Sequence, residues 1–329
     1  MVNIEELNNK IAGEATLVVN IKQELKKVII GQEDMLEKIL ISLISGGHVL
    51  LEGLPGLAKT LTIKTLAKVI SCSFKRIQFT PDLLPADIVG TMIYNQQNGN
   101  YFTKKGPLFA NIILADEINR SPAKVQSALL EAMQEKQVTI GDETFILPDP
   151  FFVLATQNPI EQEGTYPLPE AQIDRFMMKI KVGYPDKKHE KDILNLTENV
   201  NYENNINAVL NMEAIQRLQQ IARDVYIDDK LKNYIVDIVY ASRRPEDYGL
   251  GKLKSYLEYG ASPRASICLM KVAKSYALLQ QRGYVIPDDI KYMAADVLRH
   301  RLILTYEAEA ENVSTDNVIE SIIGQIEVP

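Results

Sequence analysis

The chain has 329 residues, 46% of them hydrophobic, and this length predicts two domains with buried cores. Its net charge is −7, and its lysines and arginines do not collect into one tract, which argues against a nucleic-acid-binding protein. Cys72 and Cys268 are the only cysteines, which excludes a disulfide framework or a zinc knuckle and is typical of a reducing cytoplasm.

No apolar run in the sequence approaches the ~18 residues of a membrane span, so we expect no membrane insertion. Residues 1–6 are acidic and helical in pattern, which is not typical of a signal peptide. Together with the cysteine usage, these features predict a cytoplasmic protein.

The N-terminal part predicts two helices followed by alternating strands and helices. An amphipathic helix is expected over residues 4–27, and a second from about Glu33 to Ser45, ending at the C-cap Gly46-Gly47. Fully apolar strands are typical of a parallel sheet covered on both faces. The expected strands are Val49–Glu52, Phe74–Phe79, Ile112–Asp116, Phe151–Thr156 and Met177–Val182.

Two inserts interrupt this alternation, and both read as β-hairpins. Thr91–Thr103 contains Asn98-Gly99, the strongest short hairpin turn signal. Gln137–Ile146 reads as two short strands around a tight turn. We expect both hairpins to leave the sheet rather than extend it.

From about Gly183 the strand pattern ends and the rest of the chain is mostly helical. A late helix is expected to begin at Pro287, with an apolar face made of Ile290, Met293, Ala294 and Val297. The sequence therefore predicts an α/β nucleotide-binding domain over residues 1–186 and a helical domain over residues 187–329.

A glycine-bearing loop follows the first strand and opens a helix, as in the phosphate-binding loop of P-loop nucleotidases. It reads Gly53-Leu54-Pro55-Gly56-Leu57-Ala58-Lys59-Thr60. Its backbone N–H groups and the helix N-terminus favour bound phosphates. Lys59 is expected to reach the β- and γ-phosphates, and the Thr60 hydroxyl to hold Mg²⁺. Ala58 replaces the usual glycine, and because the first helical turn does not need a positive φ, we expect it to be tolerated.

An acidic pair, Asp116-Glu117, ends the apolar strand that begins at Ile112. In an ATPase the first acid orients Mg²⁺ through its water shell, and the second polarises the attacking water as general base. A solvated pair at a strand end is the simpler alternative. The pair comes about 55 residues after the phosphate loop with one strand between, which is the placement that a nucleotidase sheet requires.

For four further polar residues the sequence leaves the role open. Asn158, after the fourth strand, either positions water opposite the γ-phosphate or is a turn residue before Pro159. Arg120, just before a helix that Ser121 caps and Pro122 begins, is either a surface charge or reaches a neighbouring subunit.

Arg175 either pairs with a nearby acid, Asp174 or Glu170, or acts in trans on a γ-phosphate. Arg264 stands in the first turn of a helix that Ser262 caps, where the helix dipole disfavours a cation. A phosphate partner would explain its position.

These motifs resemble the MoxR branch of the AAA+ ATPases. The similarity is dense over residues 28–183 and continues through Arg264 to the end. Alanine at the position of Ala58 is itself usual in this branch. The stretches that carry the resemblance are Gly53–Thr60, Gly106–Asn111 with Asp116-Glu117, Asn119–Pro122, Gln126–Met133, Ala155–Pro159 and Leu168–Phe176.

The resemblance implies an α/β fold: an AAA+ P-loop core with a parallel five-stranded sheet in the order 5-1-4-3-2, and a C-terminal helical lid. It implies that Asn158 is sensor 1, Arg175 the arginine finger acting in trans, and Arg264 sensor 2. The first hairpin matches the helix-2 insert, and residues 138–146 the hairpin before sensor 1. The implied nucleotide-binding residues are Gly31, Gln32 and the run Gly53, Leu54, Pro55, Gly56, Leu57, Ala58, Lys59, Thr60 and Leu61, with Thr60 and Asp116 at the metal.

The same resemblance implies ATP and Mg²⁺ as ligands, and a ring oligomer, typically a hexamer. It implies chaperone-like remodelling, maturation or metal-cofactor insertion of a client protein, beside a partner with a von Willebrand factor A domain. One alternative is a scaffold that assembles on ATP with negligible turnover. A DNA motor is disfavoured by the acidic balance, and a P-loop kinase by Glu117 and the arginine in the helical domain.

Overall fold

The computed structural model describes residues 4–54, 56–97, 99–159, 164–198 and 205–329. The chain folds into two compact units that interleave along the sequence. The first consists of Val19–Arg175 and Ile180–Gln216, and the second of Met1–Val18, Phe176–Lys179 and Arg217–Pro329. The domain boundary at residue 186 stays a prediction, because the two units do not correspond to a single cut.

A five-stranded sheet in the order β2-β5-β8-β1-β9 confirms the predicted 5-1-4-3-2 arrangement. β1 pairs in parallel with β8, and β8 with β5, which in turn pairs with β2. Side chains on both faces of the central strands are buried, as the apolar sequences predict. The strands are β1 (Val49–Gly53), β2 (Phe74–Gln78), β5 (Ile112–Asp116), β8 (Phe152–Gln157) and β9 (Met178–Val182).

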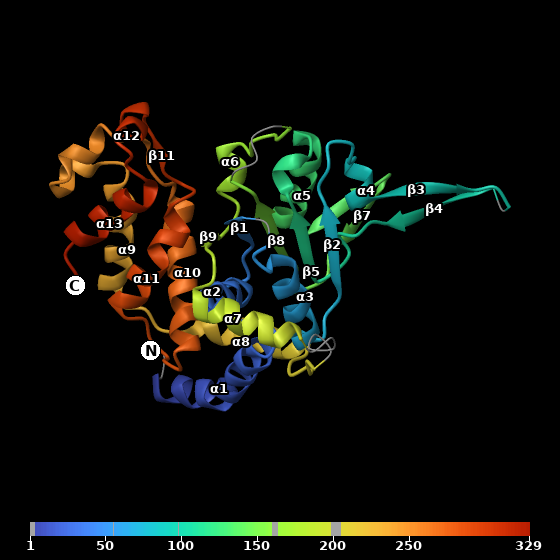
Figure 1. Ribbon diagram of the computed structural model, residues 1–329, viewed down its shortest axis with the longest axis horizontal. Helices are drawn as coiled ribbons and strands as arrows, with labels where there is room; N and C mark the ends of the chain where they lie inside the picture. The colour runs from blue at the N-terminus through green and yellow to red at the C-terminus, as the bar shows by residue number, and fades with distance from the viewer. Residues whose placement is uncertain (1–3, 55, 98, 160–163, 199–204) are drawn as a thin grey trace. The chain divides into compact units, whose positions relative to one another are not determined.

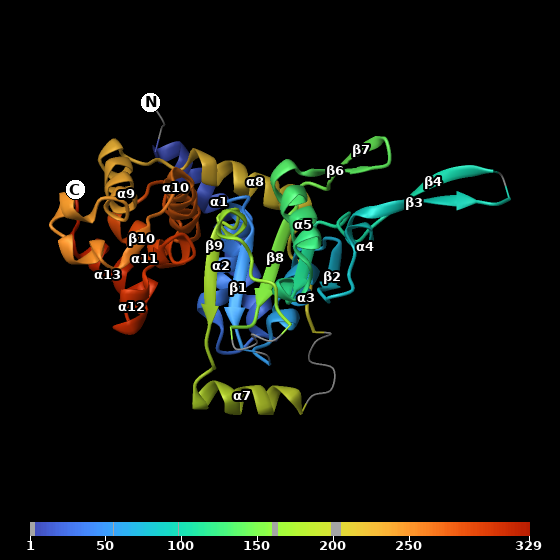
Figure 2. The ribbon, with the colours of Figure 1, turned by 90° about the horizontal axis from the view of Figure 1, so that it is seen from above.

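Helices cover both faces of this sheet, with α2 and α3 on one face and α5 on the other (Figure 1, Figure 2). The chain before the sheet forms a long helix, and short helical segments precede or follow the strands. The bounds are α1 (Ile4–Lys26), α2 (Glu33–Ile44), α3 (Lys59–Ile70), α4 (Pro85–Val89), η1 (Ile118–Arg120), α5 (Ala123–Glu135), α6 (Glu170–Ile173) and α7 (Lys187–Thr197).

Both predicted hairpins form two-stranded sheets of their own, which confirms that they leave the main sheet. β3 (Gly90–Asn95) pairs with β4 (Asn100–Lys105), and β6 (Gln137–Ile140) pairs with β7 (Glu143–Ile146). Figure 2 shows both projecting from the same side of the sheet, beyond β2. Of the first predicted turn, Asn98 lies outside the described residues, and Gly99 has a φ of +68°.

The chain after residue 205 is helical, with short 3₁₀ segments and a small two-stranded sheet, β10-β11. The predicted apolar face of α11 is fully buried: Ile290, Met293, Ala294 and Val297 each have 0% exposure. The bounds are α8 (Met212–Asp224), α9 (Asp229–Ala241), η3 (Pro245–Tyr248), η4 (Gly251–Lys254), β10 (Leu257–Tyr259), α10 (Pro263–Leu279), α11 (Pro287–Leu298), β11 (Ile303–Leu304), α12 (Tyr306–Ala310) and α13 (Thr315–Gln325).

His48 joins three elements of the first unit by hydrogen bonds. The Val153 N–H donates to Nδ1 at 3.0 Å, so the ring proton lies on Nε2, which is 3.2 Å from the Met133 carbonyl. Burial lowers the pKa of His48 to about 4, opposed by the Met133 carbonyl and aided by the charge of Lys136. The ring is therefore a neutral structural link.

We predict that acidification destabilises the fold partly through His48. The unfolded chain binds a proton below pH 6.5, but the folded chain does so only near pH 4, so stability is lost as the pH falls through this window. The loss attributable to His48 is up to about 3 kcal/mol. His300 in the second unit, whose pKa burial also lowers, adds to the same trend.

Denaturant midpoints between pH 7 and pH 4.5 test this prediction. His48→Gln, which can accept from Val153 and donate to Met133 without titrating, should flatten the pH dependence. His189→Gln, at a less buried position, is the matched control. Equal pH slopes for wild type and His48→Gln would contradict the assignment.

Candidate functional site

The loop between β1 and α3 adopts a strained conformation. Gly56 has a φ of +84°, and Ala58, at the N-cap of α3, has φ +55° and ψ +18°, in the left-handed region. The expectation that Ala58 needs no positive φ is therefore wrong. A left-handed residue other than glycine costs about 1–2 kcal/mol, and such strain gathers at functional sites.

Gly53, at the start of this loop, is required by the close approach of β9. A Cβ on Gly53 would lie 2.9 Å from both Cβ and the carbonyl oxygen of Val182. Across the loop, Lys59 Nζ donates to the Gly53 carbonyl at 2.6 Å, so the amine lies over the loop's interior. The first N–H groups of α3 have no partner within the helix. Pro55 lies outside the described residues.

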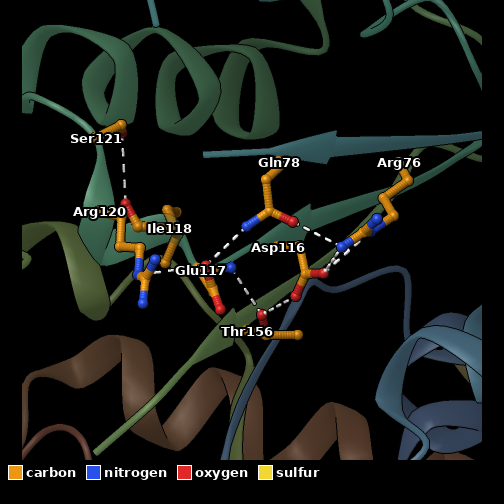
Figure 3. A network of polar contacts seen from close by, with 8 residues as sticks. All are labelled: Arg76, Gln78, Asp116, Glu117, Ile118, Arg120, Ser121 and Thr156. Atoms are coloured by element: carbon orange, nitrogen blue, oxygen red, sulfur yellow. Dashed lines mark hydrogen bonds and ion pairs between the residues drawn. The ribbon is translucent and has the colours of Figure 1, made fainter. Parts of the chain in front are cut away.

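The sheet register aligns a row of polar side chains at the carboxyl ends of three strands. Gln78 in β2 is opposite Asp116 in β5, and Ala115 is opposite Ala155, so Asp116 comes beside Thr156 in β8. Thr156 Oγ1 donates to Asp116 Oδ1 at 2.6 Å and accepts from the Glu117 N–H at 2.8 Å (Figure 3). One hydroxyl therefore fixes both acids of the pair.

Glu117 stands in a left-handed conformation, with a φ of +58°, where the chain leaves β5. Its carboxylate oxygen Oε2 accepts a hydrogen bond from Gln78 Nε2 at 2.7 Å. Arg120 Nε lies 3.3 Å from the same oxygen. Besides the two alternatives considered for it, Arg120 thus has a partner within its own chain (Figure 3).

The phosphate loop and the acidic pair line one cavity of about 390 Å³, as the spacing of the motifs predicts. The buried side chain of Asn158 also lines it, just after β8. The lining residues are Gly56, Leu57, Ala58, Lys59, Thr60, Leu61, Asp116, Glu117, Thr156 and Asn158.

The cavity fits Mg²⁺ bound together with a phosphate ligand. Thr60 and Asp116 both line it, and Mg²⁺ typically takes one or two protein oxygens and completes its shell with water and phosphates. Within the described part of the chain, no three histidine, cysteine or acidic residues form a metal cluster.

Two other predicted nucleotide-binding residues, Gly31 and Gln32, lie just before α2. Gln32 Nε2 donates to the Gly183 carbonyl at 3.0 Å. Gly31 has a φ of +73°, and a Cβ there would lie 2.8 Å from the Cβ of His189. This segment is therefore packed against the residues that follow β9. Its contact with the adenine of a nucleotide stays a prediction.

Two arginines with predicted roles, Arg175 and Arg264, are not among the residues that line the cavity. Arg175 follows α6 and is partly exposed. Arg264 is the second residue of α10 and belongs to the second unit. Their roles stay predictions. Ser262 takes the N-cap position of α10 and Pro263 its first position, as predicted, but the Ser262 side chain makes no capping hydrogen bond.

The predicted start of α5 is wrong by one residue. Pro122 is the N-cap and Ala123 the first helical residue. Ser121 ends the preceding 3₁₀ turn, and its hydroxyl lies 3.4 Å from the Ile118 carbonyl instead of capping the helix.

Three residues of the site were missed by the sequence reasoning: Arg76, Gln78 and Thr156. Thr156 carried a signal, because a hydroxyl on a buried apolar strand needs a hydrogen-bond partner. Arg76 and Gln78 alternate with Lys75 and Ile77, which places both on one face of β2. Which strand lies beside β2 could not be read from that pattern.

Two family models match the chain. The model of the ATPase family associated with various cellular activities (AAA) matches residues 48–178, and the AAA lid domain matches residues 253–322. A crystal structure of a provisionally assigned ATPase from Cytophaga hutchinsonii has a TM-score of 0.93 and 51% identity, with both chains fully covered.

Curated relatives match over nearly the whole chain. Chaperone MoxR1 of Mycobacterium tuberculosis is 50% identical over 311 residues, which is 93% of this chain and 81% of that protein. The uncharacterized protein YeaC of Bacillus subtilis is 46% identical, with 93% of each chain covered. Protein MoxR of Methylorubrum extorquens is 27% identical, with 94% of each covered.

We predict that Thr156→Val destabilises the fold although valine keeps the shape of threonine. The change leaves the Glu117 N–H without its partner and removes a donor from Asp116, which costs about 1–2 kcal/mol. Urea denaturation measures the loss. Thr156→Ser, which keeps the hydroxyl, should recover part of it. A valine variant as stable as wild type would show that the hydroxyl does not hold the pair.

Proposed function

Because the chain belongs to the MoxR family of AAA+ ATPases, we propose that it hydrolyses ATP to ADP and phosphate in the 390 Å³ cavity. The observation that carries this proposal is that the phosphate loop and Asp116-Glu117 line the same cavity. A cavity lined by the N-terminus of a helix, a lysine and two carboxylates suits the transfer of a phosphoryl group to water.

The proposed role of each residue follows from its chemistry. The loop N–H groups and Lys59 would bind the phosphates, which requires the amine to leave the Gly53 carbonyl. Thr60 and Asp116 would hold Mg²⁺, which neutralises phosphate charge. Glu117 would take a proton from the attacking water, and Asn158 would orient that water.

We further propose that each site is completed by other parts of a ring, with six subunits as the expected number. Arg175 would reach the γ-phosphate of a neighbouring subunit, and Arg264 the nucleotide of its own chain. An arginine placed in trans contributes roughly 10³–10⁵ in rate. Arg175 is suited to the trans role because it is partly exposed and is not among the residues that line the cavity of its own chain.

The two hairpins are the proposed contact with a client protein. Tyr94, Tyr101 and Phe102 on the first hairpin are 49–65% exposed, and Ile146 on the second is 81% exposed. The hairpins also touch, since a Cβ on Gly141 would lie 2.4 Å from Met92 Sδ. Exposed aromatic residues on a projecting hairpin suit a protein-binding surface.

The work done on the client would be remodelling, maturation or metal-cofactor insertion, beside a von Willebrand factor A domain partner. The relative from M. tuberculosis is described as a chaperone, which supports this reading. None of the described helices is long and apolar enough to cross a membrane. Both cysteines are free thiols, which suits the cytoplasm we propose.

We predict that Glu117→Gln binds ATP but hydrolyses it about 10²- to 10⁴-fold more slowly, because an amide cannot act as the base. Nucleotide binding and phosphate release are measured separately. Glu131→Gln, the same change at an exposed position on α5, is the control and should retain activity. Full hydrolysis by Glu117→Gln would exclude the assigned role.

The competing function is a scaffold that assembles on ATP with negligible turnover. Turnover by the wild-type protein, measured over a range of protein concentrations, separates the two. An ATPase whose sites are shared between subunits gains specific activity as the ring assembles, whereas a scaffold assembles without such a gain.

We also predict that mixing Arg175→Ala with Lys59→Ala subunits restores part of the ATPase activity that each variant lacks alone. In a mixed ring, an intact phosphate loop of one subunit can face an intact Arg175 of the next. Native mass spectrometry must show that mixed rings form. Stable mixed rings without any recovered activity would contradict a finger acting in trans.

A further inference from the structure

Arg76 makes a forked contact with the carboxylate that the proposed function assigns to Mg²⁺. Its Nε and Nη2 lie 3.0 Å and 2.7 Å from Asp116 Oδ2. Nη2 also donates to Gln78 Oε1 at 2.6 Å. Figure 3 shows the guanidinium reaching Asp116 from β2, on the side of the carboxylate opposite Thr156.

Most of the hydrogen-bond acceptor positions of the Asp116 carboxylate are already used. An ionised carboxylate accepts at about four lone-pair positions. Three are used, two by Arg76 on Oδ2 and one by Thr156 on Oδ1. One position on Oδ1 stays open, beside the Thr156 hydroxyl. A metal shell that uses Oδ2 must displace Arg76 or share that oxygen with its guanidinium. Two cations at one carboxylate also repel each other.

Of the two donors, Arg76 is the one that can leave. Its side chain is 48% exposed on the edge strand β2, so it can turn into solvent without leaving a buried group unpaired. The Thr156 hydroxyl is buried and also accepts the Glu117 N–H, so its removal would break two contacts.

We infer that Arg76 is a displaceable counter-ion that sets the Mg²⁺ affinity of this site. Before loading it neutralises Asp116, and it gives up Oδ2 when the metal shell takes its place. Arg76 is thus a positioning residue that acts through Asp116. The inference rests on the proposed ATP site and adds a competition between the metal and the protein's own cation.

The expected effect is moderate because the ion pair is partly exposed. Pairs of this kind contribute little, so the metal can displace the arginine at ordinary concentrations. Removing the charge of Arg76 should lower the Mg²⁺ concentration needed for half-maximal binding of an ATP analogue by about five-fold, which corresponds to about 1 kcal/mol.

The test measures binding rather than turnover. A fluorescent ATP analogue is titrated into Arg76→Gln and Arg76→Ala at increasing Mg²⁺, and again in EDTA. We expect both variants to need about five-fold less Mg²⁺ than wild type, with an unchanged affinity in EDTA. Arg76→Lys, which keeps the charge, should stay near wild type.

Lys75→Gln is the matched control, since it removes the same charge from the neighbouring, exposed position on the other face of β2. An equal shift in Lys75→Gln would reduce the effect to overall charge and overturn the inference. An unchanged or higher Mg²⁺ requirement in both uncharged Arg76 variants would also overturn it.

These failures are distinct from failure of the proposed function. If the wild-type protein binds no ATP analogue with or without Mg²⁺, the ATP site itself is wrong and the inference falls with it. If wild type binds the analogue, Lys59→Ala does not, and only the Mg²⁺ shift is missing, the inference alone is overturned.

Discussion

The site depends on the hydrogen bonds of a single hydroxyl. Thr156 Oγ1 donates to the Asp116 carboxylate and accepts from the Glu117 N–H, and so it joins β8 to the end of β5. Parallel pairing makes this possible, because the carboxyl ends of adjacent strands meet at one edge of the sheet. The edge of the sheet that collects the acids is also the edge where the phosphate loop leaves β1.

Two left-handed residues flank this edge, and both serve the cavity. Glu117 turns the chain so that its side chain meets Gln78 and Arg120, and Ala58 turns the loop into α3. Each costs free energy that the surrounding hydrogen bonds must offset. Such strain is a physical sign of a functional site that does not depend on the names of related proteins.

The fold and the main motifs could be predicted from the sequence, but the local geometry could not. Apolar strands and hairpin turns predicted the elements, because these signals are periodic or local. The strand order was implied by the resemblance of the motifs to the MoxR branch, and the observed sheet agrees with it. The left-handed Ala58 was missed because alanine rarely adopts a positive φ, so the residue type gives no sign of it. The cap at Ser121 was misplaced because Ser121 ends a 3₁₀ turn and α5 begins only at Ala123.

Arg76 was missed for a different reason, and that reason bears on how the site works. Its partner is set by strand order, which brings residues 40 positions apart into contact. In the isolated chain each acid is therefore paired with an arginine of its own, Asp116 with Arg76 and Glu117 with Arg120. Two neighbouring carboxylates in a partly buried cavity repel each other unless cations neutralise them, and the two arginines do so here. The proposed roles would affect the two pairs differently. Mg²⁺ would compete with Arg76 for Asp116, whereas Glu117 would need only one free lone pair to accept a proton from water. If the proposed function holds, loading of the metal is the step at which the Arg76–Asp116 pair has to open.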